Sequence, residues 1–355
     1  MNDFNKKKVL ITGNTGFKGS WLSIWCLMKG AIVYGMSKDI PTKQSMFETL
    51  KLESRLTQYW LDVRDSVRVT DAVKEICPDV IFHLAAQPIV SKSYKDPIET
   101  VETNVLGAAN ILEAARHLSR NVVIVFITSD KCYENVEWNY GYRESDKLGG
   151  SDLYSASKAC AEILVNAYYK SFYKNNSNIR ICSARAGNVL GGGDWALDRI
   201  VPDAIRSWTK NEVLQIRNPH STRPWQHVLE PLSGYLKLAV ELMKSDRLNG
   251  MSFNFGPTSE MTKSVEELLM EMSSKWEGEI SYEVLGETRT FHEAGLLKLN
   301  CDMALAHLNW TSRLDFNELV SFTVDWYMED LRGVADMFEY TKKQIVEFEI
   351  KKNGC

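Results

Sequence analysis

The stretch VLITGNTGFKGSWL at residues 9–22 decides the fold, because a short β-rich run passes through a glycine turn into a helical pattern. The turn contains Gly13, Gly16 and Gly19. Glycines at this spacing permit a tight bend, let a phosphate approach the backbone and let the helix pack on the strand. The helix N-terminus then offers free N–H groups to a pyrophosphate. A purely structural turn is the alternative, but the strand–turn–helix context favours a dinucleotide site.

Outward from this turn, β-rich and helical patterns alternate through residue 130 and a little beyond. The runs VIFHL and VVIVFIT are continuously apolar, as expected for strands covered on both faces. This alternation predicts an α/β fold with a Rossmann-like, doubly wound parallel sheet. The expected strands are 8–12, 31–36, 80–84, 122–129 and 178–185, and the expected helices are 18–29, 66–76, 99–117 and 154–174.

The pattern loosens after about residue 193, where loop-like segments such as GGGDW and NPHSTRPW separate helical stretches. We therefore expect a dinucleotide-binding domain over residues 1–192 and a smaller, mainly substrate-binding C-terminal lobe over 193–355. Residues 251–255 are a candidate return strand to the first domain. Helices are expected near 200–210, 230–244 and 265–275.

Composition is that of a globular protein, with 355 residues, 44% apolar residues, 25% charged residues and a net charge of −4. The charge gives no support for nucleic-acid binding. The longest apolar run, 122–127, is too short to cross a bilayer, and the N-terminus lacks a signal-peptide pattern, so we expect a cytoplasmic protein with no membrane partner. Seven cysteines without a CxxC pair predict reduced thiols and no metal site.

The adenosine end of the predicted site carries an unusual residue. The second strand ends YGMSKD, which places Ser37 and Lys38 where an aspartate would bind a ribose. Lys38 could instead meet a 2′-phosphate, so the turn leaves NAD and NADP both open. Asp62 and Val63, after the run YWLDV, are candidates for holding the adenine, with a strand-end cap as the alternative for Asp62.

Tyr154 and Lys158 stand four residues apart in DLYSASKACAE, which places them on one helix face. A nearby ammonium favours phenolate over phenol, so we expect a lowered tyrosine pKa and a catalytic base. This spacing also occurs by chance in amphipathic surface helices. The glycine turn and the parallel-sheet pattern favour the catalytic interpretation.

Together these features resemble the extended short-chain dehydrogenases/reductases. HLAAQ at 83–87, Asn104 and TSDKCY at 128–133 complete the resemblance, which covers nearly the whole chain. TSDKCYEN, ARAGNVLGGGDW and STRPWQHV resemble the nucleotide-sugar 4,6-dehydratases, and among them the branch acting on CDP-glucose. The resemblance implies a lyase that uses NAD to oxidise C4 of the sugar, eliminate water across C5 and C6 and reduce C6. Such a reaction serves deoxysugar and O-antigen biosynthesis.

The resemblance also assigns catalytic roles at the end of the strand before TSDK. It implies that Ser129 hydrogen-bonds the 4-oxygen, where relatives carry threonine, and that Asp130 protonates the leaving C6 hydroxyl. Lys131 departs from the glutamate that serves as C5 base in the dTDP-glucose enzymes. A lysine can act as that base only if its pKa falls, so Asp130 or a water remains an alternative.

The remaining assignments are binding roles implied by the resemblance. The cofactor-binding set contains Gly13, Gly16, Phe17, Gly19, Asp62, Val63, Leu84, Ala85, Ala86, Tyr154 and Lys158. The set for the nucleotide-sugar contains Arg185, Asn188, Arg199, Arg223 and Arg289. Relatives pair through the helices matching 99–117 and 154–174, which implies a homodimer or homotetramer.

Three other functions compete with this interpretation. A nucleotide-sugar epimerase or decarboxylase would share Tyr154 and Lys158, but it would not need the acid–base pair Asp130 and Lys131. A 4,6-dehydratase acting on a dTDP- or GDP-sugar would differ only in the base that it recognises. A non-enzymatic NAD sensor could lose the Tyr–Lys pair without penalty, so the presence of the pair disfavours it.

Overall fold

A seven-stranded parallel sheet forms the centre of the protein, in the strand order β11-β6-β5-β4-β1-β2-β3. The computed structural model describes residues 3–175, 178–258, 261–278, 280–285, 296–333 and 336–351. The strands of the sheet are β1 (Lys8–Thr12), β2 (Ile32–Ser37), β3 (Thr57–Trp60), β4 (Val80–His83), β5 (Val122–Ile127), β6 (Ile179–Ala186) and β11 (Ser252–Phe255). The predicted doubly wound α/β fold is confirmed, and a strand is present at the candidate position near 251–255.

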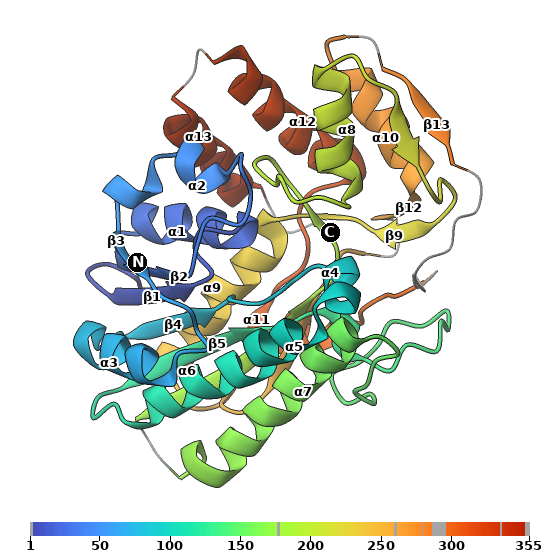
Figure 1. Cartoon of the computed structure of the whole chain (residues 1–355). Coiled ribbons are helices and arrows are strands. Elements are labelled where there is room, and N and C mark those ends of the chain that lie inside the picture. The colour runs from blue at the N-terminus through green and yellow to red at the C-terminus, as the bar shows by residue number, and fades with distance from the viewer. Residues whose placement is uncertain are drawn as a thin grey trace.

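Helices cover both faces of this sheet (Figure 1). One face carries α3 (Ser66–Ile76), α6 (Gly107–Arg116) and α7 (Leu153–Tyr168). The other face carries α1 (Phe17–Met28) and α9 (Leu229–Lys244). Alternate residues of β5 serve the two layers, since Val123 and Val125 face one cluster while Ile124 and Phe126 face the other. Coverage on both sides explains why the strand sequences are continuously apolar.

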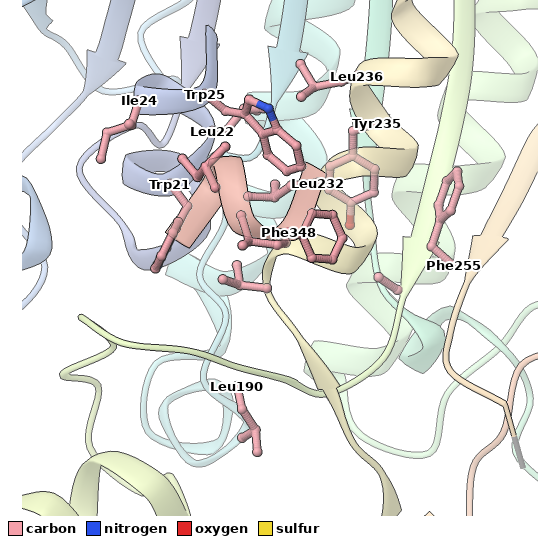
Figure 2. Close-up of a cluster of buried hydrophobic side chains, with 14 of the residues drawn as sticks. Trp21, Leu22, Ile24, Trp25, Leu190, Leu232, Tyr235, Leu236, Phe255 and Phe348 are labelled. Carbon is pink, nitrogen blue, oxygen red and sulfur yellow. The ribbon is translucent and has the colours of Figure 1, made fainter. Parts of the chain in front are cut away.

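The C-terminal part of the chain packs directly on the first part. Besides α9, its helices are α8 (Ile200–Thr209), α10 (Val265–Lys275), α11 (Asp302–Leu308), α12 (Phe316–Arg332) and α13 (Met337–Ile350). Figure 2 shows Phe348 of α13 among Trp21 and Trp25 of α1 and Leu232 of α9. Trp21 also donates a hydrogen bond from Nε1 to the carbonyl oxygen of Gly192 at 2.9 Å. The predicted lobe therefore shares a core with the sheet domain.

Within the described ranges, three small two-stranded sheets lie outside the main sheet. They pair β7 (Val189–Leu190) with β10 (Gln226–His227), β9 (Thr222–Pro224) with β12 (Thr262–Ser264), and β8 (Leu214–Ile216) with β13 (Tyr282–Val284). A short helix, α2 (Met46–Thr49), precedes β3. No helix among the described residues is long and apolar enough to span a membrane.

Two long helices expected from the sequence are not uniform. The stretch 99–117 comprises the end of α5 (Pro97–Val101), a π-helical turn η2 (Glu102–Leu106) and α6. The helix expected at 154–174 is α7 followed by a second π-helical turn, η4 (Tyr169–Tyr173). A short helix, α4 (Val90–Lys95), precedes α5. Single π turns inside helices often mark functional positions.

Candidate active site

The three glycines of the turn between β1 and α1 lie in different environments. Gly13 has φ +72°, and a Cβ there would lie 2.8 Å from the backbone nitrogen of Ala85. A Cβ on Gly19 would lie 2.1 Å from the carbonyl oxygen of Gly13, so helix and turn pack together only without a side chain. Gly16 differs, because its Cβ would meet only the Gly13 oxygen, at 3.4 Å. The space in front of Gly16 is therefore open to a ligand.

A large cleft opens at the carboxyl edge of the sheet, where open α/β sheets bind ligands. Its volume is ≈ 1870 Å³, and it is lined by the glycine turn and by the segments following β2, β3, β4, β5 and β6. Gly16 is the N-cap of α1, and no side chain caps the helix there. Because single small-molecule pockets typically measure ~300–1,000 Å³, this cleft has room for a dinucleotide and a second ligand together.

The predicted cofactor residues all line this cleft. Leu84, Ala85 and Ala86 follow β4, while Asp62 and Val63 follow β3. Asp62 accepts hydrogen bonds from the backbone nitrogen of Arg64 at 2.9 Å and from its guanidinium at 2.8 Å. Burial alone would raise the pKa of Asp62, but these hydrogen bonds outweigh it and hold the pKa below its usual value. A stable carboxylate thus stands at the end of the cleft beside β2 and β3.

The predicted catalytic residues come together at the end of β5 and the N-terminal part of α7. Ser129 and Asp130 follow β5, and Tyr154 lies in the first turn of α7. The Ser129 hydroxyl donates to Oδ1 of Asp130 at 2.8 Å, and it also hydrogen-bonds the Tyr154 side chain. Lys158 places its Nζ 5.9 Å from the centre of the Tyr154 ring. Lys131 lines the same cleft, so all five predicted catalytic side chains share one space.

The expected lowering of the tyrosine pKa is not what the structure shows. Burial raises the pKa of Tyr154 to about 12, against the Ser129 hydrogen bond, which lowers it. Burial also lowers the pKa of Lys158 to about 8, against Cys132 and Glu162, which raise it. The ammonium charge alone would lower the tyrosine pKa, but loss of solvent disfavours the charged form of both groups and outweighs it.

A polar network fixes the position of α7 relative to β4. Asn104, inside the π turn η2, accepts from the Gln87 backbone nitrogen at 2.7 Å and donates to Ser157 at 2.9 Å. Ser157 in turn donates to the carbonyl oxygen of Tyr154 at 2.7 Å. Asn104 therefore acts through the backbone on the position of Tyr154.

His83 has the structural role that a buried histidine commonly takes. Its Nδ1 lies 2.8 Å from the hydroxyl oxygen of Thr12, and burial lowers its pKa to about 3. It is therefore neutral throughout the physiological range.

The predicted nucleotide-sugar residues divide into three groups. Asn188, Arg199 and Arg223 line the cleft, and Arg199 pairs with Asp194 at 2.7 Å. Arg185 does not lie with them, because its guanidinium donates to Glu162 at 2.7 Å in a buried ion pair that lines a separate, smaller cavity. Its position at the end of β6 suggested a ligand contact, but the side chain points into the protein. Arg289 lies outside the described residues.

Two further cleft residues, Lys18 and Asp194, are not predicted from the sequence. Both line the cleft, and burial lowers the pKa of Lys18 to about 8, with Arg199 acting in the same direction and Asp130 opposing it. A lysine in the first turn of a helix that packs on a sheet was the available signal. Asp194, in GGGDW, offered none beyond its glycine-rich surroundings. The described residues contain no group of three or more His, Cys, Asp or Glu side chains placed to hold a metal.

Comparison with known proteins places this chain in a family. Residues 10–323 match the family model described as GDP-mannose 4,6 dehydratase. The chain is 43% identical to CDP-glucose 4,6-dehydratase of Salmonella typhimurium, over 98% of this chain and 97% of that protein. It is 28% identical to CDP-paratose 2-epimerase of Salmonella typhi, over 74% of this chain and 82% of that protein.

Solved structures agree on the fold. The UDP-glucose 4-epimerase of Thermus thermophilus, solved in complex with NAD, matches with a TM-score of 0.78 at 23% identity, over 92% of this chain and all of that one (100%). The match of the family model to most of the chain, together with the Salmonella typhimurium relative, shows that the protein belongs to the GDP-mannose 4,6-dehydratase family of extended short-chain dehydrogenases/reductases.

Proposed function

We propose that the protein is an NAD-dependent CDP-glucose 4,6-dehydratase, a hydro-lyase that forms CDP-4-dehydro-6-deoxy-D-glucose. The observation that carries this proposal is the 43% identity to a CDP-glucose 4,6-dehydratase over nearly the full length of both chains. The position of Asp130 and Lys131 beside Tyr154 supports a dehydratase over an epimerase, because only dehydration must expel a hydroxyl group.

The cleft fits a nicotinamide dinucleotide at the glycine turn. The open space before Gly16 and the uncapped N-terminus of α1 suit a pyrophosphate. Asp62 and Val63, after β3, are proposed to lie on the adenosine side, while Leu84, Ala85 and Ala86 follow β4, which lies between β3 and β5 in the sheet. When bound, the cofactor would supply reversible oxidation and reduction of the sugar.

Tyr154 is the group proposed to take the proton from the 4-hydroxyl. Its oxygen shares a hydrogen bond with Ser129, which would hold the 4-oxygen in the same place. Burial raises the pKa of Tyr154 to about 12, so the phenol is protonated at neutral pH in the ligand-free protein. Arg199 and Ser129 already act to lower that pKa. In this proposal Tyr154 therefore acts as a base with the help of neighbouring groups such as Ser129 and Arg199, which oppose the effect of burial.

Asp130 and Lys131 are proposed to carry the elimination. Asp130 is buried and lies beside Gly187, where a Cβ would be 3.2 Å from its Oδ2. Because Gly187 has no side chain, nothing on that residue covers the carboxyl group, and Asp130, Gly187 and Asn188 all line the cleft in which the sugar is proposed to bind. In this assignment Asp130 protonates the departing C6 oxygen and Lys131 removes the C5 proton. Lys131 lines the cleft and is only partly buried.

The nucleoside diphosphate is proposed to occupy the part of the cleft lined by Asn188, Arg199 and Arg223. Guanidinium groups suit bidentate contact with phosphate. In this proposal residues 193–355 mainly form the nucleotide-sugar lobe, while residues 1–192 and β11 hold the cofactor. A cytoplasmic homodimer or homotetramer, assembled through the α5–α6 and α7 regions, completes the proposal.

Proton NMR of sugar nucleotides incubated with the protein and catalytic NAD tests the activity. A C6 methyl doublet arising from CDP-glucose, and absent with the Tyr154→Phe variant, is the expected result. CDP-, dTDP- and GDP-sugars supplied in parallel identify the base that is recognised. Interconversion of 4-epimers without a methyl signal would replace the dehydratase by an epimerase.

A further inference from the structure

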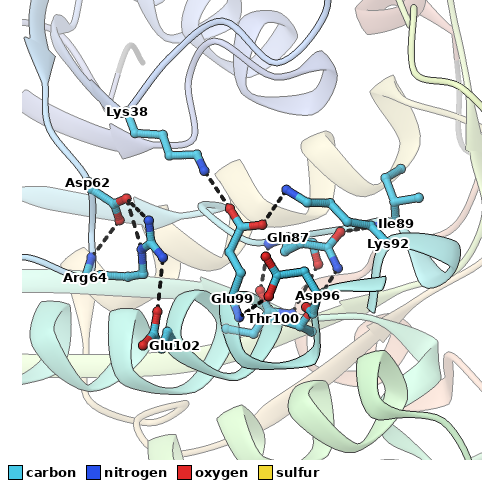
Figure 3. A network of polar contacts seen from close by, with 11 residues as sticks. Lys38, Asp62, Arg64, Gln87, Ile89, Lys92, Asp96, Glu99, Thr100 and Glu102 are labelled. Atoms are coloured by element: carbon cyan, nitrogen blue, oxygen red, sulfur yellow. Dashed lines mark hydrogen bonds and ion pairs between the residues drawn. The ribbon is translucent and has the colours of Figure 1, made fainter. Parts of the chain in front are cut away.

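Three charged side chains from three separate segments meet at the adenosine end of the cleft. Lys38 directly follows β2, Lys92 lies on α4 and Glu99 lies on α5. The Lys38 Nζ is 2.8 Å from Oε1 of Glu99, and the Lys92 Nζ is 2.5 Å from Oε2. Figure 3 shows the Glu99 carboxylate between the two ammonium groups. All three residues line the cleft, so a ligand at this end would meet this bridge.

The bridge changes what Lys38 can offer to a cofactor. A basic residue after the second strand is a typical partner for the 2′-phosphate of NADP. Here Lys38 already has a carboxylate partner, and its pKa is raised by the hydrogen bond with Glu99. The hydrogen bonds from Lys38 and then Lys92 lower the pKa of Glu99 to about 2. The carboxylate therefore stays ionised throughout the neutral range.

Glu99 is also the best-anchored member of the group. Its side chain is 15% exposed, against 40% for Lys38 and 46% for Lys92. Its backbone nitrogen is fixed by the Asp96 side chain, the N-cap of α5, at 3.0 Å. Two lysines already bonded to one carboxylate form a weakened receptor for a further dianionic group, because the phosphate must compete with that carboxylate.

We propose that Glu99 is a specificity-determining residue that favours NAD over NADP, by occupying Lys38 and by opposing a 2′-phosphate at the adenosine end of the cleft. This inference rests on the proposed function, since it assumes that a nicotinamide dinucleotide binds here. Ser37 and Lys38, after β2, leave the choice between NAD and NADP open. In this proposal Glu99, on α5, makes that choice.

Isothermal titration of the purified full-length chain with NAD⁺ and NADP⁺ tests the proposal. ADP-ribose and 2′-phospho-ADP-ribose serve as second probes, because they differ only at the position in question and lack the nicotinamide. The wild-type protein is expected to prefer NAD⁺. In Glu99→Gln the affinity ratio should move toward NADP⁺ by about tenfold, since a neutral amide keeps the shape but releases Lys38.

Two variants sharpen the comparison. Glu99→Gln combined with Lys38→Gln should lose the gain, because Lys38, directly after β2, is the cation proposed to meet the 2′-phosphate, although Lys92 remains. Glu113→Gln is the matched control, since Glu113 likewise contacts two basic side chains, Arg116 and His117, but does not line the cleft. Its affinity ratio should equal that of the wild type.

The outcomes separate this inference from the function on which it rests. Normal NAD⁺ binding with an unchanged ratio in Glu99→Gln would overturn the role of Glu99, as would a wild-type preference for NADP⁺. Failure of the wild-type protein to bind either dinucleotide would instead overturn the proposed cofactor. Thermal unfolding of each variant shows whether the fold is intact.

Discussion

Burial sets the protonation states of the catalytic residues. Tyr154 has a pKa raised to about 12 and Lys158 a pKa lowered to about 8, both chiefly through loss of solvent. The pair therefore shifts toward neutral side chains, and the charge needed for proton transfer depends on neighbours such as Ser129 and Arg199. Side-chain identity could predict the pair, but burial of this depth is a property of the packed cleft.

Replacing Tyr154 by phenylalanine should lower turnover by about 10²–10⁴-fold, because it removes the oxygen that accepts the proton while keeping the ring. NAD binding, measured by titration, should change little. Tyr168→Phe is the control, since Tyr168 lies on the same helix but does not line the cleft. Full activity in Tyr154→Phe would remove this residue from the mechanism.

Replacing Lys131 by methionine should block elimination at C5, because methionine keeps the length of the side chain but cannot accept a proton. Incorporation of solvent deuterium at C5, followed by mass spectrometry, should stop. Lys147→Met, at an exposed lysine outside the cleft, should exchange normally. If Asp130→Asn stops the exchange and Lys131→Met does not, Asp130 is the base; if neither stops it, both assignments are wrong.

At the scale of elements, the three glycines of the turn between β1 and α1 serve two purposes, namely close packing of the backbone and binding of a ligand. The structure separates these tasks, because only Gly16 faces open space. Its φ of −77° is accessible to any L-residue, so neither backbone strain nor a close contact explains the glycine. A ligand approaching the helix N-terminus does explain it.

Gly16→Val should therefore weaken NAD binding by tenfold or more, as an order-of-magnitude expectation for a blocked phosphate site, with little change in thermal stability. Gly19→Val is the contrasting variant, since its Cβ would overlap the turn backbone at 2.1 Å and should destabilise the fold itself. Titration and thermal unfolding of both proteins give the comparison. Normal NAD affinity in Gly16→Val would make the turn purely structural.

Much of the element pattern could be predicted because both faces of the sheet are covered. The strand at 8–12 and the helices at 66–76 and 265–275 have the expected bounds. The π turn at Glu102–Leu106 could not be predicted from periodicity, and the Asn104 side chain inside it bonds residues distant in sequence. Periodicity describes one helix at a time, whereas these bonds join three segments.

At the scale of the whole molecule, residues distant in sequence decide which predicted side chains reach the cleft. Arg185 and Asn188 are three residues apart, yet only Asn188 lines it. Arg185 instead compensates Glu162 on α7, a partner that the local sequence does not indicate. Motif matching could therefore locate the cleft, but it could not decide which arginines support the fold.

The same packing predicts a dependence of stability on pH. Burial lowers the pKa of His83 and of His227 from 6.5 to about 3. Below pH ~6.5 the unfolded chain binds protons at both residues while the folded chain does not, so their contribution to stability is lost as pH falls. Urea unfolding should show the free energy of unfolding declining from pH ~6.5 to ~5. A free energy that is constant over this range would contradict the prediction.

Glu230 should oppose that decline. Burial raises its pKa from 4.5 to about 7, against hydrogen bonds from the backbone nitrogens of Leu314 and Arg313. The folded chain therefore holds a proton here that the unfolded chain releases, and this stability is lost as pH rises through 7. Glu230→Gln keeps an acceptor oxygen for both nitrogens but cannot titrate. Between pH ~6 and ~5 the free energy of unfolding of Glu230→Gln should fall more steeply than that of the wild type. The difference in slope should be ~1.4 kcal/mol per pH unit, the value for one proton. Parallel profiles of the two proteins would show that Glu230 is not protonated in the folded state.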